Sequence, residues 1–441
     1  MKVLLIYPRF QWTEHGQMQE PLGLLYIASV LKDQGFEVDL LDFTFEKSLE
    51  KLKSGLDSAD AVGLTTSSVL FNRAAHILKR IREIKPRLPV IAGGPHPTAD
   101  PAGTLAAGFD FAVVGEGEQT AVELFSALAQ GKDGLGVPGA WARKGDDIFP
   151  AQLRAVIPDI NIIPLPRRAL LDYKKYLWNG MFQVGVCLSR GCPFQCKFCK
   201  PMQDLLFGKK LRKRNPEGVA EEIDQAIALT GHRFFLFRDD CLTSLKKEWF
   251  EKFRSELEKR KIKITFSGQT RVSGLDEEML VLLKSIGLVG LAFGVESGSQ
   301  KIIDYYRKSF KVEESIPAFE ICHKHGIGTH CFIMLGAPEE TKEDLRMTID
   351  LVKRIKPESI TISRLTPAPG TYLNQELTAQ GILKPLEWEQ WDFYKNQSPL
   401  KLKYLTEADL MSTENELRSL VPGSILYPRK QIFSCEQIAD R

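Results

Sequence analysis

The stretch that decides the fold reads Cys187-Leu-Ser-Arg-Gly-Cys192-Pro-Phe-Gln-Cys196-Lys-Phe198-Cys199-Lys. Its last three cysteines fall within eight residues, separated by three and then two residues. Three soft thiolates on one short loop indicate a metal site. Because cubane iron–sulfur clusters are usually held by four cysteines, a cluster on these three would keep one iron open for a substrate or cofactor.

A structural zinc site is the alternative to a cluster. Zinc sites normally close with a fourth nearby Cys or His, usually in a second pair, and none follows soon after Cys199. A disulfide framework is also disfavoured, because eight cysteines in 441 residues is a low count. The run from Met1 to Pro8 is too short for a signal peptide, so a reducing, cytoplasmic compartment is expected.

The cysteine spacing, with the aromatic Phe198 directly before the last cysteine, resembles the signature of the radical S-adenosylmethionine (SAM) superfamily. The resemblance implies a 4Fe-4S cluster on Cys192, Cys196 and Cys199 with SAM at its open iron. It further implies cleavage of SAM to a 5′-deoxyadenosyl radical, which abstracts hydrogen from an unactivated carbon. An external electron donor such as a flavodoxin or ferredoxin would reduce the cluster.

Chain length and net charge limit the number of domains and the classes of function. A chain of 441 residues is long for one hydrophobic core and fits two domains with a short appendage. Lys and Arg exceed Asp and Glu by only three, so no global field draws the protein to nucleic acid. No apolar stretch reaches the roughly 18 to 20 residues of a membrane span.

The first part of the chain alternates apolar strands with helical patterns. Strands are expected at residues 3–7, 38–41, 61–64, 89–92 and 111–114, with a helix at 22–34. Continuous apolar strands separated by helices indicate a parallel sheet covered on both faces. Residues 1–130 are therefore predicted to form a flavodoxin-like, doubly wound α/β domain that binds ligands at the carboxyl ends of its strands.

Small and glycine-rich residues stand at those strand ends, where they let a bulky, flat ligand approach closely. Together with Pro21-Leu22-Gly23, they resemble the cobalamin-binding domain found upstream of many radical SAM enzymes. The fingerprint Asp-x-His-x-x-Gly is absent after the first strand, so the resemblance implies cobalt without a histidine on its lower face. The candidate cobalamin residues are Pro8, Arg9, Thr65, Thr66, Ser67, Ser68, Gly93, Gly94, Pro95, His96, Gly115, Glu116 and Gly117.

Residues 131–180 are rich in Gly and Pro and are expected to form an ordered linker, with a small hairpin around 144–147. Six further strands are expected at 182–186, 234–237, 265–268, 290–293, 329–334 and 359–365. Six strands rather than eight predict an incomplete (β/α)6 barrel over residues 181–385, with its site on the carboxyl-end loops. Residues 386–441 are a C-terminal extension whose aromatic residues are expected to close the barrel, namely Trp388, Trp391, Phe393 and Tyr394.

Polar residues end three of the barrel strands, and the ribose, ammonium and carboxylate of SAM need such partners. By resemblance, Asp239 or Asp240 lies near the amino group of SAM, and Arg271 is a candidate for its carboxylate. Pairing of these charges with one another at the barrel rim is the alternative. The full set of expected SAM contacts is Phe198, Asp239, Asp240, Gln269, Arg271, Glu296 and Ser297.

Two further groups have simpler interpretations. The basic run 209–214 is expected to be a solvated loop, and a phosphate-bearing ligand is its alternative. Cys241, Cys322 and Cys331 sit in apolar surroundings and are expected to be buried small hydrophobes.

The two resemblances predict a cobalamin-dependent radical SAM C-methyltransferase acting on a small-molecule or natural-product-type substrate. In such enzymes methylcobalamin delivers the methyl group and a second SAM restores it. A relative that closes a ring, rearranges or dehydrogenates without methyl transfer would need the same motifs, so this alternative stays open. A cobalamin or redox sensor is the non-enzyme alternative, disfavoured because a mere scaffold would not need the polar strand ends.

Overall fold

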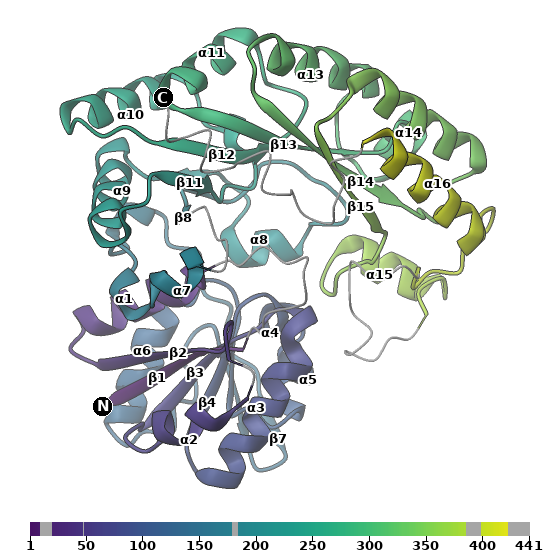
Figure 1. Ribbon diagram of the computed structural model, residues 1–441. Helices are drawn as coiled ribbons and strands as arrows, with labels where there is room; N and C mark the ends of the chain where they lie inside the picture. The colour runs from purple at the N-terminus through teal and green to yellow at the C-terminus, as the bar shows by residue number, and fades with distance from the viewer. Residues whose placement is uncertain (9–19, 47, 179–183, 385–397, 422–441) are drawn as a thin grey trace.

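The computed structural model describes residues 1–8, 20–46, 48–178, 184–384 and 398–421 (Figure 1). Two α/β units follow one another along the chain, and the short helix α8 (Met202–Phe207) lies between them. In the part of the chain that is described, no helix is long and apolar enough to cross a membrane.

The first unit is built on a seven-stranded sheet in the order β2-β1-β3-β4-β5-β6-β7. The first five strands are parallel, as predicted, and their order is that of a flavodoxin-like fold. The last two are antiparallel and form the expected hairpin. The strands are β1 (Lys2–Tyr7), β2 (Glu37–Asp42), β3 (Ala61–Thr65), β4 (Val90–Gly93), β5 (Phe111–Val113), β6 (Ala140–Lys144) and β7 (Asp147–Phe149).

The hairpin corrects one detail of the expected linker. Ala140 and Ala142 are buried in the same core as β5, so the first sheet continues beyond residue 130 into the segment 131–180. Short side chains at alternate positions let β6 lie flat against this core. The limit of the first domain at residue 130 stays a prediction.

Helices cover both faces of this sheet. Val3 and Leu5 of β1 join one core with α1 (Leu22–Asp33) and α6 (Glu118–Ala129). Leu4 and Ile6 join a second core with α2 (Glu50–Leu56) and α3 (Phe71–Ile84). Because successive strand residues point to opposite faces, a continuous apolar strand feeds two cores at once.

The second unit is a six-stranded, fully parallel sheet in the order β15-β14-β13-β12-β11-β8, which is the predicted incomplete barrel. Helices line its outer, convex side (Figure 1). The strands are β8 (Val184–Val186), β11 (Phe234–Phe237), β12 (Thr265–Thr270), β13 (Leu288–Glu296), β14 (Gly328–Leu335) and β15 (Ser359–Arg364). The main helices are α9 (Pro216–Thr230), α10 (Lys247–Lys259), α11 (Glu277–Ile286), α13 (Ser315–Lys324) and α14 (Lys342–Ile355).

The C-terminal extension contributes α16 (Glu407–Leu420), which packs against α14 at the end of the sheet. Its Leu410 and Leu417 are fully buried in the barrel core. The aromatic residues expected to close the barrel, from Trp388 to Tyr394, lie outside the described residues.

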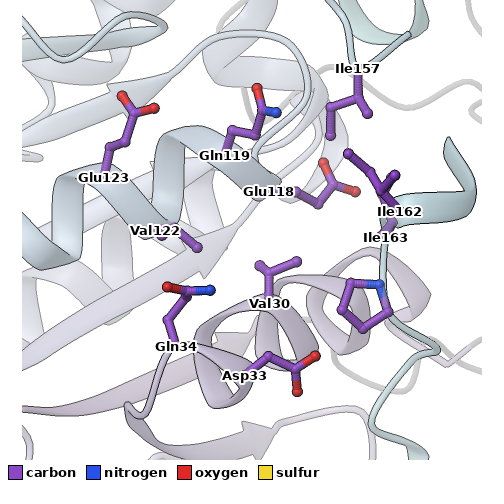
Figure 2. Close-up of a pocket in the computed structure, with 11 residues that line it drawn as sticks. Val30, Asp33, Gln34, Glu118, Gln119, Val122, Glu123, Ile157, Ile162 and Ile163 are labelled. Carbon is purple, nitrogen blue, oxygen red and sulfur yellow. The ribbon is translucent and has the colours of Figure 1, made fainter. Parts of the chain in front are cut away.

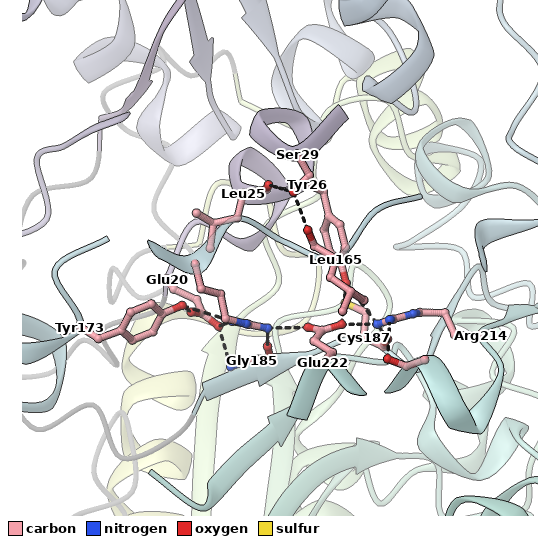
Figure 3. A network of polar contacts seen from close by, with 12 residues as sticks. Glu20, Leu25, Tyr26, Ser29, Leu165, Tyr173, Gly185, Cys187, Arg214 and Glu222 are labelled. Atoms are coloured by element: carbon pink, nitrogen blue, oxygen red, sulfur yellow. Dashed lines mark hydrogen bonds and ion pairs between the residues drawn. The ribbon is translucent and has the colours of Figure 1, made fainter. Parts of the chain in front are cut away.

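A buried polar network fastens the two units together (Figure 3). Arg168 donates to Glu20 Oε1, just before α1, at 2.7 Å and to Glu222 Oε1, on α9, at 2.5 Å. Arg214 pairs with the other oxygen of Glu222. Glu20 also accepts the backbone N–H of Gly185 on β8 at 2.7 Å. Two arginines and two glutamates balance in charge here, as burial requires.

Ion pairs with distant carboxylates correct the expectation for the basic run 209–214. Arg212 and Arg190 belong to a two-stranded ribbon of β9 (Ser189–Arg190) and β10 (Arg212–Lys213), and both pair with Glu116 of the first unit. Arg214 is buried on Glu222, so only the lysines of the run are exposed. The partners lie far away in the sequence, so a local charge pattern could not reveal them.

Candidate functional site

A cavity of about 270 Å³ opens at the carboxyl ends of the barrel strands. It gathers the three motif cysteines and all the expected SAM contacts except Asp239 and Ser297. The predicted residues that line it are Cys192, Cys196, Phe198, Cys199, Asp240, Gln269, Arg271 and Glu296. Parallel strands meet at one edge, so residues that are distant in sequence share this space.

The three motif cysteines line one cavity, where a cubane would bind each of them through a different iron. Among the described residues, no three His, Cys, Asp or Glu side chains converge on one metal position. Burial raises the pKa of Cys192 to about 11, so its thiol must lose a proton when it binds iron.

Glu296 reaches the cavity through an irregular backbone. Its φ is +67°, and the register of β13 and β14 shifts between Gly294 and Glu296. A positive φ at a residue with a side chain costs free energy and often marks a functional site. The carboxylate accepts from Lys308 Nζ at 2.8 Å. Sequence reasoning missed Lys308, because it follows a short helix and belongs to no motif.

Asp240 is held by the segment that follows the cluster loop. Its Oδ2 accepts from Gln203 Nε2 at 2.7 Å, and burial raises the pKa of the carboxyl. Lys200 is almost fully buried, and its Nζ donates to the Cys192 carbonyl at 2.9 Å and to Gln203 Oε1. Lys200 and Gln203 were not predicted either. They tie the cluster loop to the end of β11.

Asp239 and Ser297 lie outside the cavity. Asp239 accepts from the Leu188 N–H at 3.1 Å and from the Ser189 hydroxyl, so it anchors the start of the cluster loop. Burial raises its pKa to about 6. Ser297 shares a hydrogen bond with Thr348 at 3.2 Å. Successive side chains at a strand end point in opposite directions, so one residue of each adjacent pair reaches the cavity.

The predicted cobalamin residues occupy the strand ends of the first unit. Gly94 has a φ of +103°, and a Cβ there would come within 3.0 Å of the Thr66 carbonyl oxygen. At Gly93 a Cβ would meet nothing closer than 3.9 Å, so this backbone edge leaves room for a flat ring. The glycines and small hydroxyl residues thus fit a corrin. Arg9 lies outside the described residues.

Two of the predicted cobalamin contacts are occupied otherwise. His96 is fully buried, with its ring 3.8 Å from that of Phe71 and its Nδ1 3.2 Å from Ser68 Oγ. Burial lowers its pKa to about 4, so the imidazole is neutral. Glu116 pairs with Arg190 and Arg212 and so joins the two units, and its contact with cobalamin stays a prediction.

The two strand-end regions approach each other through α8. A Cβ at Gly115 would stand 2.9 Å from the Leu205 carbonyl oxygen of α8, and one at Gly370 would stand 3.2 Å from Ala99 Cβ. Helix α8 begins three residues after Cys199 and also touches α4 (Pro95–Ala99). The loop that carries the cysteines is therefore continuous with a helix resting on the cobalamin-type loops (Figure 1).

A separate hollow of about 420 Å³ lies between α1, α6 and residues 157–164. Figure 2 shows Val30, Val122 and Ile157 around it, with Asp33, Glu118 and Glu123 among its polar residues. None of the predicted site residues lines this hollow, so it is distinct from the candidate site.

Comparison with known proteins agrees with both halves of the chain. A B12-binding domain model matches residues 13–125, and a radical SAM superfamily model matches residues 186–352. An uncharacterised methyltransferase of Pyrococcus horikoshii is 30% identical over 93% of this chain and 90% of its own length. An anaerobic magnesium-protoporphyrin IX monomethyl ester cyclase of Rubrivivax gelatinosus is 28% identical over 89% of this chain and 72% of its own length.

Among solved structures, the radical SAM methyltransferase TsrM of Kitasatospora setae, with cobalamin and a 4Fe-4S cluster bound, superposes with a TM-score of 0.76. It is 19% identical and covers 98% of this chain and 91% of its own, which shows a shared fold. With both domain models and a relative matched over nearly its full length, the chain belongs to the cobalamin-dependent radical SAM enzymes, whose cofactors are a 4Fe-4S cluster, SAM and cobalamin.

Proposed function

We propose that this protein is a C-methyltransferase that moves a methyl group to an unactivated carbon of a small-molecule substrate. The observation that carries the proposal is the direct contact of α8 with the cobalamin-type loops at Gly115. It sets the helix that follows the cluster loop directly against the cobalamin-type loops, which supports a reaction that uses both cofactors. When bound, the cofactors supply hydrogen abstraction and a transferable methyl group.

The residues of the chain hold and shield the reactants. Cys192, Cys196 and Cys199, which line the cavity, would hold the cluster. The carboxylates of Asp240 and Glu296 offer acceptors to the ammonium or ribose hydroxyls of SAM, each already fixed by a neighbour. The aromatic walls, Phe194, Phe198 and Phe332, keep the cavity poor in water, which protects a radical from side reactions.

A second function stays open because of one relative. The Rubrivivax protein is named for a cyclase and still matches 89% of this chain, so the shared framework is compatible with ring formation without methyl transfer. We also propose an external one-electron donor such as a flavodoxin or ferredoxin, and a cytoplasmic, reducing compartment. The described cysteines are free thiols, which fits such a compartment.

The experiment uses SAM that carries a trideuterated methyl group. The anaerobically reconstituted holoenzyme is incubated with a reductant and a library of candidate substrates. Methyl transfer should give a product that retains all three deuterium atoms on a new carbon–carbon bond, detected by mass and deuterium NMR. A product that has lost hydrogen and contains no label would favour the cyclase-type alternative.

A further inference from the structure

Arg271 is a buried cation with no carboxylate partner among the described residues. It follows β12 directly, and its side chain is 6% exposed. Within the described ranges no carboxylate pairs with it; its Nε donates to Ser273 Oγ at 3.5 Å, and its Nη2 has no hydrogen-bond partner. A buried, uncompensated guanidinium is costly, so the position calls for a negative group that the chain's own carboxylates do not supply.

The neighbours of Arg271 come from the cluster loop. Its Nη1 donates to Cys196 Sγ at 3.4 Å. The guanidinium lies over the ring of Phe194, 4.0 Å from the ring centre, and Phe194 stands between Cys192 and Cys196 in the sequence. The loop therefore holds the arginine by an aromatic face and by a cysteine sulfur at the same time.

The acidic side chains of the cavity are engaged elsewhere. Glu296 is paired with Lys308 at 2.8 Å, and Asp240 accepts from Gln203 at 2.7 Å. When Cys196 binds iron it loses its proton and becomes a thiolate. This thiolate then lies within hydrogen-bond distance of Arg271 Nη1.

We propose that Arg271 is the counter-ion of the Cys196 thiolate and raises the reduction potential of the cluster. Hydrogen bonds to the sulfurs and local charge are among the factors that set such potentials. Reduction adds one negative charge, so a cation with an N–H pointed at sulfur stabilises the reduced form. The unpartnered Nη2 stays available for an anionic group of SAM. The inference requires the cluster, but it is independent of methyl transfer.

The test is a redox titration of the cluster, followed by electron paramagnetic resonance. The reconstituted protein contains no SAM, no cobalamin and no substrate. In Arg271→Gln, iron and sulfide content should match wild type. The ratio of reduced to oxidised cluster at a fixed potential should fall about tenfold, which is ~59 mV for a one-electron couple. The matched control is Arg346→Gln, on the exposed side of α14, which removes one arginine charge far from the cavity and should leave the potential unchanged.

A residue that served only the carboxylate of SAM would leave this SAM-free potential unchanged, so a cluster-loaded Arg271→Gln with the wild-type potential overturns the proposal. If Arg271→Gln binds no cluster, Arg271→Lys decides. Its ammonium keeps the charge but loses the planar fork, and its potential should lie below that of wild type. A potential of Arg271→Lys above that of wild type, or failure of that variant to bind iron, would also refute the proposal, because this variant keeps the compensating charge and loses only the planar donor fork.

Discussion

The buried network between the two units gives the sharpest prediction about stability. Glu222 is 1% exposed and accepts from Arg168, from Arg214 and from the Tyr26 hydroxyl at 3.3 Å. Glu222→Gln keeps the shape of the side chain but removes its charge. Arg168 then keeps the carboxylate of Glu20, whereas Arg214 loses its ion-pair partner, so the network carries an unbalanced positive charge.

Removing one partner of a buried ion pair typically costs about 3–5 kcal/mol, because the other charge is left uncompensated. We expect the free energy of unfolding of Glu222→Gln to fall by an amount in this range. The double variant Glu222→Gln/Arg214→Met leaves one buried arginine opposite Glu20. Because this restores the charge balance, the double variant should be more stable than Glu222→Gln alone.

The assay is urea denaturation followed by circular dichroism. Its matched control is Glu221→Gln, the neighbouring exposed glutamate on α9, which should stay within about 0.5 kcal/mol of wild type. Equal losses in Glu222→Gln and in the double variant would refute the charge-balance argument. A loss of less than about 1 kcal/mol in Glu222→Gln would refute the claim that Glu222 compensates a buried positive charge.

Three further outcomes are expected. Replacing the three cluster cysteines together by Ala should abolish iron and sulfide in the reconstituted protein, whereas Cys322→Ala, a buried thiol on α13, should retain both. In denaturation experiments, Gly115→Ala should lower the stability of the protein more than Gly131→Ala. Both glycines have a positive φ, but only a Cβ at Gly115 would come within 2.9 Å of another backbone atom. Equal losses of stability would contradict the contact with α8. Burial raises the pKa of Glu340 to about 7, above its unfolded value, so its contribution to stability is present below about pH 4.5 and is lost as pH rises through 7. Glu340→Gln should remove this pH-dependent loss of stability, which is worth about 3 kcal/mol by linkage. Stability that changes with pH in the same way in wild type and in Glu340→Gln would contradict the prediction.

The fold could be predicted because its signals are local. The strand Phe234–Phe237 has the predicted bounds, since four consecutive apolar residues between polar ones leave little choice. The three-cysteine loop could be found in the same way, because its ligands lie within eight residues. The side chains that hold the site in place were harder. Lys308 reaches Glu296 across a turn that carries no motif.

The direction in which a side chain points was the second property that the sequence did not reveal. A sequence shows that Asp239 and Asp240, or Glu296 and Ser297, are adjacent at a strand end, but it does not show which of the two faces the cavity. The pleat decides this, and at Glu296 a local register shift alters the pleat. The ion pairs of Glu116 could not be predicted, because its partners Arg190 and Arg212 lie 74 and 96 residues away in the sequence.

The central claim is that one enzyme uses both cofactors for methyl transfer, and the ratio of the two SAM co-products tests it most directly. The holoenzyme is supplied with reductant, SAM and substrate extract, and S-adenosylhomocysteine and 5′-deoxyadenosine are quantified by liquid chromatography. One molecule of SAM is expected to methylate the cofactor and one to form the radical, so substrate-dependent turnover should give the two products in a ratio of one to one. Sustained, substrate-dependent 5′-deoxyadenosine without S-adenosylhomocysteine, in protein loaded with cobalamin, would contradict the account.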